Sequence, residues 1–153
     1  MKAANPKRCF ISERRVQISL IIIILVAALL RFYRLDGQSL WADEGNSVAL
    51  AGRDLATIAR NAARDIHPPL YYWLLHFWVM AFGKSEIAVR SLSALLGTAL
   101  VYLTFLLGCR LFGRRVGLAA ALLSALSPFQ VYYSQEARMY ILATLLGASS
   151  VLL

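Results

Sequence analysis

The sequence predicts an all-α fold: a polytopic bundle of transmembrane helices whose extracytoplasmic first loop carries interfacial amphipathic helices. Hydrophobic residues make up 59% of the chain, whereas soluble domains contain roughly half. Charged residues account for only 16% and occur in clusters. Apolar stretches lie at 16–30, 92–109, 116–133 and 139–153. A membrane-spanning helix needs about 20 such residues, or ~17 where flanking cations reach the headgroups.

The distribution of cations orients these predicted spans. Five of the 16 cations lie in the first 15 residues, and three more are Arg110, Arg114 and Arg115. The positive-inside rule places both groups in the cytoplasm. This placement accounts for much of the net charge of +8, so we expect no nucleic-acid partner.

The predicted segments follow from the apolar stretches and the charges. They are a basic cytoplasmic tail at 1–15, transmembrane helix 16–33, extracytoplasmic loop 34–91, transmembrane helix 92–109, cytoplasmic loop 110–115, transmembrane helix 116–133, extracytoplasmic turn 134–138, and the start of a fourth transmembrane helix at 139–153. The first stretch is interpreted as a retained anchor, because no small-x-small cleavage site follows it. Cys9 and Cys109 both fall on the cytoplasmic side, where thiols stay reduced, so no disulfide is expected.

The segment 67–83 decides the topology. Its apolar part has about 14 residues, or roughly 21 Å as a helix, which is short of the ~30 Å hydrocarbon core. It is rich in tyrosine and tryptophan, which favour the membrane interface. If it crossed the membrane, the Arg110–Arg115 cluster would face outward. We therefore predict that it lies along the outer interface.

Residues 47–64 have the periodicity of one amphipathic helix in the interface. The apolar positions recur every three or four residues and are Val48, Ala51, Leu55, Ile58 and Ala62. Arg53, Arg60 and Arg64 lie on another face. They are expected either to contact lipid headgroups or to form a phosphate-binding surface, because the planar guanidinium donates two parallel hydrogen bonds.

Two adjacent carboxylates, Asp43 and Glu44, stand in the sequence WADEGN, shortly after the first apolar stretch. One interpretation is helix N-capping, although Asn46 or Ser47 could cap the helix instead. The other is a general base at the outer face of the membrane, with a neighbouring acid that tunes its pKa or orients the substrate. The local sequence leaves both open.

Three further positions are candidates for function. His67 precedes a double proline, which predicts either a rigid corner or a histidine that faces the site. Pro128 interrupts an apolar span and is expected to break or bend it. Glu136 and Arg138 follow at the outer rim, where they form an ion pair with each other or take part in function.

Five sequence segments occur in a characteristic order: RFYRLDGQSLWADEGNSVAL, HPPLYYWLLHFWVMAFG, SEIAVRSLSALLG, LFGRRVGLAAALLSALSP and YYSQEARMY. Together they resemble the N-terminal third of the membrane glycosyltransferases of the C superfamily. The resemblance is greatest to bacterial enzymes similar to protein O-mannosyltransferases and to the lipid A aminoarabinose transferase. It covers nearly the whole chain from Arg31 onward.

The resemblance implies an enzyme of the bacterial inner membrane with an extracytoplasmic active site and a cytoplasmic N-terminus. Such enzymes transfer a sugar from a polyprenyl-phosphate carrier to a hydroxyl acceptor on a lipid, a polysaccharide or a protein. Asp43 matches the catalytic base, with Glu44 beside it in the acidic motif. Glu136 and Arg138 are the nearest match to a later polar cluster. The aminoarabinose branch has a lysine where this chain has His67.

The expected mechanism is an inverting displacement. The carboxylate removes the proton of the acceptor hydroxyl as the bond to the anomeric carbon forms. Cations near the leaving phosphate would stabilise its charge, and Arg138, His67, Arg53 and Arg60 are the candidates. The sequence has no metal-ligand spacing, and a divalent cation remains a possible cofactor.

Two alternatives stay open at this point. One is a non-enzymatic membrane protein, such as a transporter fragment or a scaffold. The other is an inactive truncated paralogue, because the family's later spans and its C-terminal region are absent. The chain is accordingly expected to be an N-terminal piece of a longer enzyme.

Overall fold

The computed structural model describes residues 14–64 and 68–153. Over these residues it contains eight helices and no strand, so the predicted all-α fold is confirmed. The helices are α1 (Arg14–Phe32), α2 (Ala42–Ala51), α3 (Leu55–Arg64), α4 (Pro69–Phe82), α5 (Glu86–Phe112), α6 (Arg114–Leu126), α7 (Pro128–Ser134) and α8 (Tyr140–Leu152). His67, Cys9 and most of the predicted tail at 1–15 lie outside the described residues.

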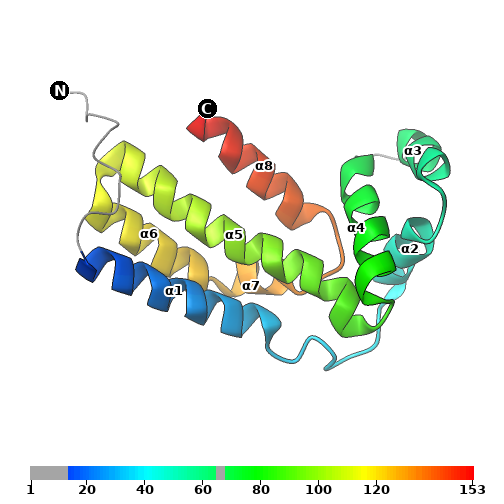
Figure 1. Cartoon of the computed structure of the whole chain (residues 1–153), viewed down its shortest axis with the longest axis horizontal. Coiled ribbons are helices and arrows are strands. Elements are labelled where there is room, and N and C mark those ends of the chain that lie inside the picture. Colours follow the sequence, from blue (N-terminus) through cyan, green and yellow to red (C-terminus); the bar gives the residue numbers. More distant parts are fainter. Residues whose placement is uncertain (1–13, 65–67) are drawn as a thin grey trace.

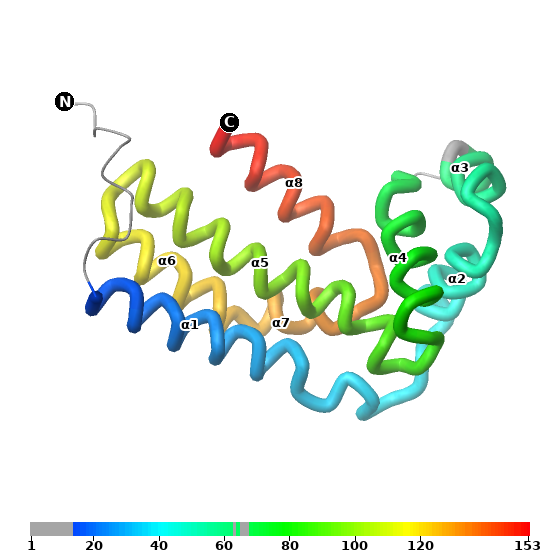
Figure 2. Tube along the Cα trace, in the orientation of Figure 1, coloured from blue at the N-terminus to red at the C-terminus, as the bar shows by residue number. Residues whose placement is uncertain are grey.

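The helices form an elongated bundle with a separate group of helices at one end. Helices α1, α5 and α6 lie side by side, and α7 and α8 pack on α5 (Figure 1). We call α2, α3 and α4 the cap, because they gather at the end where α5 begins (Figure 1). From the cap, α8 runs back along α5 in the same direction (Figure 2). The central helix α5 thus connects the bundle with the cap.

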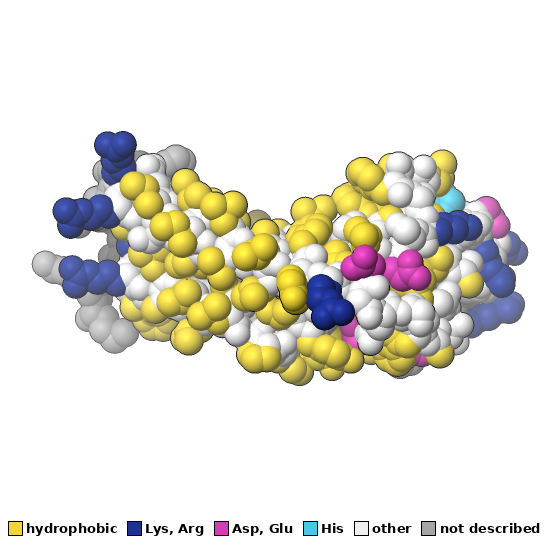
Figure 3. Space-filling view, turned by 90° about the horizontal axis from the view of Figure 1, so that it is seen from below, with side chains coloured by type: hydrophobic (Ala, Val, Ile, Leu, Met, Phe, Trp, Pro, Cys, Tyr) yellow, Lys and Arg dark blue, Asp and Glu magenta, His cyan; other side chains and the backbone are white. Residues whose placement is uncertain are grey.

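Two of the described helices, α1 and α5, are long and apolar enough to cross a membrane by their length and composition. Helices α6 and α7 meet this criterion only as a pair, with a bend of 61° between them, and α8 is apolar but shorter. On the face in Figure 3, hydrophobic side chains cover the middle of the bundle, basic side chains gather at both ends of the molecule, and acidic ones lie towards the cap. This distribution is that of an integral membrane protein.

The bend between α6 and α7 lies at Pro128, as the sequence predicted. Proline has no N–H group, so the carbonyl of Ser124 loses its usual partner four residues later. The buried side chain of Arg31 replaces that partner, because it donates hydrogen bonds of 3.2 Å to the carbonyls of Ser124 and Ala125. A cation from α1 therefore stabilises the C-terminal carbonyl groups of α6, which lack a backbone N–H partner.

Helices α5 and α6 cross closely at a pair of glycines. A Cβ atom added to Gly108 would lie 2.7 Å from the Cα of Gly117. A Cβ atom added to Gly117 would lie 2.8 Å from the carbonyl oxygen of Phe105. Small residues allow membrane helices to approach in this way, so this crossing sets the angle of the α5–α6 hairpin.

The cap corrects one prediction, because the single helix expected over 47–64 is two helices. Residues 52–54 break it, and Oδ1 of Asp54 accepts a hydrogen bond of 2.9 Å from the backbone N–H of Thr57 in α3. Aspartate competes well for such free N–H groups at the start of a helix. The break lets Ala51 and Ile58 both become buried against α4.

Helix α4 is held between α2 and α5. Its His76 forms a hydrogen bond of 2.7 Å with the carbonyl of Ala51 in α2. On the other side, Trp78 donates to the carbonyl of Ala88 in α5 at 2.8 Å. Its 14 residues match the short apolar segment that the sequence predicted. The placement of this helix along the membrane interface remains a prediction.

Helix α5 begins earlier than the predicted span at 92–109. Ser85 caps it by accepting a hydrogen bond of 3.3 Å from the N–H of Ala88, and the helix then extends over 27 residues. The first turns contain Arg90 and Ser93, which are polar and buried. The prediction from apolar composition finds only the part of a helix that lipid can surround. It did not include the first turns of α5, because their polar residues are buried by other parts of the protein.

Candidate active site

Asp43 lies in the first turn of α2, at the edge of the cap nearest the bundle. Its side chain retains 45% of its exposure, so it is open to other molecules. It forms an ion pair with Arg138, which follows it by 95 residues in the chain. The acidic motif of the first loop and the later SQEAR segment thus meet at one place.

Arg138 is held by aromatic side chains as well as by Asp43. Its guanidinium carbon lies 5.8 Å from the ring centre of Trp41 and 5.0 Å from that of Tyr140. Aromatic faces attract such a cation. The side chain retains only 12% of its exposure, so the positive charge has a fixed position beside the carboxylate.

Glu44, the second acid of the motif, is fully buried and points the other way. Its two oxygens accept hydrogen bonds of 2.9 and 2.6 Å from Nε and Nη2 of Arg90 in α5. The same carboxylate accepts from the backbone N–H of Ala137 at 3.0 Å and from that of Trp41 at 3.4 Å. Glu44 therefore joins α2, α5 and the loop before α8.

Arg90 completes this connection. Besides Glu44, it donates to the carbonyls of Leu35, Gln38 and Ser39 at 2.6, 2.8 and 3.3 Å. Five donors are available on a guanidinium, and these contacts use all of them. The pair is thus a fully satisfied buried salt bridge that fixes the connection between α1 and α2.

The hydrogen bonds around Glu44 also determine its charge. Burial acts to raise the pKa of this carboxyl, but the hydrogen bonds from Arg90, Ala137 and Trp41, together with the charge of Arg90, outweigh burial and lower the pKa below its ordinary value. Glu44 is therefore ionised but enclosed. This placement favours a positioning role over the catalytic role that the sequence suggested.

The N-capping interpretation of the motif is correct only in part. Helix α2 begins at Ala42, so neither Asn46 nor Ser47 caps it, contrary to the suggestion from the sequence. Glu44 instead reaches back to the N–H group of Trp41 in the manner of a capping box. The capping hydrogen bond comes from Glu44, so the carboxylate of Asp43 is available to pair with Arg138.

Glu136 is buried, with 7% of its surface exposed. The ion pair of Arg138 is with Asp43, so the suggested Glu136–Arg138 pair is not what forms. Glu136 nevertheless lies two residues before Arg138 in the same loop, and the N–H of Arg138 donates to its carbonyl at 2.9 Å. It helps to shape that loop.

The structure does not bring every predicted phosphate ligand to this place. Arg53 and Arg60 are exposed, and Arg60 donates to Thr57 within its own helix at 3.1 Å. Helix α4 separates α3 from the loop that carries Arg138 (Figure 1). The geometry therefore favours the headgroup interpretation for both arginines. His67 lies outside the described residues, just before Pro68 and α4.

Within residues 14–64 and 68–153, no group of three or more histidine, cysteine, aspartate or glutamate side chains is placed to hold a metal ion. The possible divalent cation remains a prediction.

Comparison with known proteins supplies the family. A sequence model of the family described as dolichyl-phosphate-mannose-protein mannosyltransferase matches residues 66–153, more than half of the chain. The chain belongs to this family. This mannosyltransferase-family chain is therefore an integral membrane protein of a glycosyltransferase-like family. The matched region includes Arg138 but begins after Asp43, and the ion pair joins the two.

One curated relative also matches part of the chain. An uncharacterized protein of Aquifex aeolicus (strain VF5) is 28% identical over 102 residues, which cover 62% of this chain and 20% of the relative. The mannosyltransferase-family chain thus spans about a fifth of the length of that relative. No solved structure matches the chain.

Sequence reasoning missed Arg90, Trp41 and Tyr140. Arg90 stands in an apolar context at the start of α5, and a buried arginine needs a partner, which was a usable signal. Trp41 is the first residue of WADEGN, and Tyr140 follows SQEAR by two residues. Their contact with Arg138 depends on tertiary packing, so the sequence contained no signal for it.

Proposed function

We propose that this chain supplies the acceptor-activating part of a membrane glycosyltransferase. In this proposal a sugar passes from a polyprenyl-phosphate donor to a hydroxyl of a lipid, a polysaccharide or a protein, on the extracytoplasmic face of the inner membrane. The observation that carries the proposal is the ion pair between Asp43 and Arg138. It brings a half-exposed base and a fixed cation together at the end of an apolar bundle.

Asp43 would act as the general base. A hydroxyl is a weak nucleophile near neutral pH, and a carboxylate within hydrogen-bond reach can take its proton as the new bond forms. The acceptor oxygen bonds to the anomeric carbon while the bond from that carbon to the phosphate oxygen breaks. Attack from the face opposite the leaving group inverts the anomeric centre.

Arg138 would receive the leaving phosphate. The departing group gains negative charge, and a cation held beforehand in the correct position stabilises that charge without reorganisation. Arginine suits this task because its planar fork binds two phosphate oxygens. Since Arg138 is paired with Asp43 before the donor arrives, donor phosphate would compete for the guanidinium and release the carboxylate for catalysis. His67 is a second proposed contact for the phosphate.

Glu44 and Arg90 would position these groups. Glu44 fixes Ala137 next to Arg138 in the chain and Trp41 near Asp43. Its role is then to hold the two halves of the site together. Arg53 and Arg60 would instead contact lipid headgroups along the interface.

A paired measurement on the full-length protein tests the proposal. Asp43→Asn keeps the shape of the side chain but cannot accept a proton, so transfer from a labelled polyprenyl-phosphate sugar should fall by about 10²–10⁴-fold. Arg138→Gln should mainly raise the KM for the donor. Protein level in the membrane should be unchanged for Asp43→Asn, because Asp43 is half exposed. The level of Arg138→Gln is measured alongside, because Arg138 is mostly buried.

The matched control is Asp54→Asn, an exposed aspartate in the same cap. Asparagine caps helices as well as aspartate does, so this variant should keep normal transfer. Near-normal transfer by Asp43→Asn would show that the acidic motif is structural. It would then favour the scaffold or inactive-paralogue alternative.

A further inference from the structure

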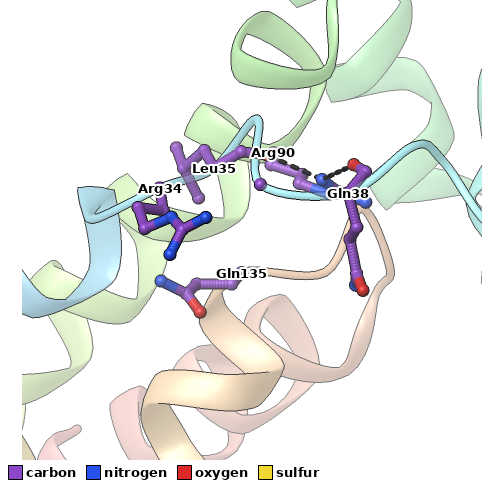
Figure 4. A pocket seen from close by; sticks show the side chains of 6 residues that line it. Arg34, Leu35, Gln38, Arg90 and Gln135 are labelled. Carbon is purple, nitrogen blue, oxygen red and sulfur yellow. Dashed lines mark hydrogen bonds between the residues drawn. The ribbon is translucent and has the colours of Figure 1, made fainter.

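The turn after α1 forms one wall of a pocket that does not include the Asp43–Arg138 pair. The pocket has a volume of about 240 Å³, and its lining residues are Arg34, Leu35, Gly37, Gln38, Arg90 and Gln135. Figure 4 shows the guanidinium of Arg34 pointing towards the amide of Gln135. The volume is about eight times the ~30 Å³ of a water molecule, which suits a small polar group.

Arg34 gives this pocket its charge. Its backbone has φ of 52°, a left-handed conformation that is uncommon for residues other than glycine. The turn is closed by a hydrogen bond of 2.9 Å from the N–H of Gly37 to the carbonyl of Arg34. In the described part of the chain, the exposed guanidinium of Arg34 has no ion pair or hydrogen bond. Unusual backbone geometry of this kind clusters at binding sites.

A second arginine increases the positive potential. Arg31, one helical turn earlier, is fully buried and donates only to the carbonyls of Ala27, Ser124 and Ala125. Among the described residues its Nε atom has no hydrogen-bond partner. Arg90 differs, since Glu44 neutralises it. The end of α1 therefore carries two cations without a carboxylate partner in the described region, which favours an anion there.

Gln135 contributes an acceptor to the same pocket. Its Nε2 atom donates to the carbonyls of Leu30 and Tyr33 at 3.1 and 3.0 Å, at the end of α1. These contacts fix the orientation of the amide, because only the nitrogen can donate to carbonyl groups. The carbonyl oxygen of Gln135 remains to accept a hydrogen bond from a ligand. All donors of Arg90 are already used, so Arg90 is only a wall of the pocket.

We propose that this pocket binds a phosphate ester that carries a neighbouring hydroxyl. Arg34 would bind the phosphate oxygens with its planar fork, and the oxygen of Gln135 would accept from the hydroxyl. The pocket lies where an apolar helix ends, at the level of the cap. The ligand is either the headgroup of a glycerol-based anionic phospholipid or a free phosphate ester. The site does not depend on the proposed transfer reaction.

The test uses two probes on the full-length protein in detergent. Glycerol phosphate represents the free ester, short-chain phosphatidylglycerol represents the lipid, and calorimetric titration measures the dissociation constants. Arg34→Asn removes the charge but keeps the turn, because asparagine tolerates the left-handed conformation. It should weaken binding about tenfold or more, as expected for loss of a charge-assisted contact. Arg34→Lys should lose less.

Arg115→Asn is the matched control, since Arg115 is exposed at the opposite end of the bundle, and it should bind as the unaltered protein does. Asp43→Asn should also keep this binding, which separates the pocket from the transfer site. Arg34-dependent binding of both probes supports a site open to free esters, and such binding of the lipid alone supports a headgroup site. Equal binding by Arg34→Asn and the unaltered protein, or no binding of either probe, would overturn the proposal.

Discussion

Three arginines near the cap differ in how fully their donors are used. Arg90 uses all five of its N–H donors in hydrogen bonds to Glu44 and to backbone carbonyls between α1 and α2. Arg138 has one acidic partner and two aromatic neighbours, so it is fixed but can still change partner. Arg34 has no partner among the described residues. We therefore assign a structural role to Arg90 and propose that the other two bind ligands.

This difference predicts the effect of Glu44→Gln on stability. A neutral amide leaves the buried Arg90 without a counter-charge, and breaking a buried pair from one side costs about 3–5 kcal/mol. The free energy of unfolding in detergent should fall by that amount. Asp43→Asn breaks a pair that is only partly buried, since Asp43 retains 45% of its exposure, so it should cost less than Glu44→Gln. An equal loss in the two variants would contradict the assigned roles.

The lowered pKa of Glu44 gives the same pair a pH dependence. The carboxyl titrates lower in the folded state than in the unfolded chain, so its contribution is fully present above the unfolded pKa of about 4.3. The contribution is lost as pH falls through the lower, folded value. Unfolding measured between neutral and acid pH should show this loss in the unaltered protein, and Glu44→Gln should lack that part of the pH dependence.

At the scale of elements, close contacts of backbone atoms decide how the helices cross. Gly117 meets Phe105 and Cys109 of α5 with no room for a side chain, whereas Gly147 of α8 has open space around it. At Pro128 the helix bends because Arg31 can satisfy the carbonyls that the proline leaves free. The crossing thus needs small residues, whereas the bend needs the long side chain of Arg31.

The two glycines predict opposite outcomes for one substitution. Gly117→Ala places a methyl group 2.8 Å from a backbone oxygen, and such overpacking costs about 1–3 kcal/mol. Gly147→Ala should be neutral or stabilise α8, because alanine is the better helix former. Thermal unfolding of the purified protein measures both. A Gly117→Ala variant as stable as the unaltered protein would show that the crossing is not close-packed.

At the scale of the whole molecule, the basic turn and the acidic motif lie at opposite ends of α5. The helix has 27 residues, or about 40 Å at 1.5 Å per residue, which is enough to cross a bilayer. The turn between α5 and α6 contains Arg114 and Arg115, and the cap contains Asp43. We therefore propose that the cap is extracytoplasmic and that this turn is cytoplasmic.

Cysteine labelling tests this orientation. In a background with Cys9 and Cys109 replaced by serine, the exposed sites Asn46→Cys and Arg115→Cys are compared. A membrane-impermeant thiol reagent should label position 46 in intact cells and position 115 only after permeabilisation. Labelling of Arg115→Cys alone in intact cells would reverse the topology and exclude an extracytoplasmic Asp43.

The sequence by itself determined the helical fold, the apolar spans and the bend at Pro128, because composition, periodicity and proline act locally along the chain. The role of Asp43 as a base came from the family resemblance and stays a prediction. Only the tertiary structure decided that Glu44 turns inward to Arg90 while Asp43 turns outward to Arg138. The two acids are adjacent and chemically alike. Their directions are set by partners 46 and 95 residues away in the chain. Local sequence patterns do not show which distant residues become neighbours in the folded protein.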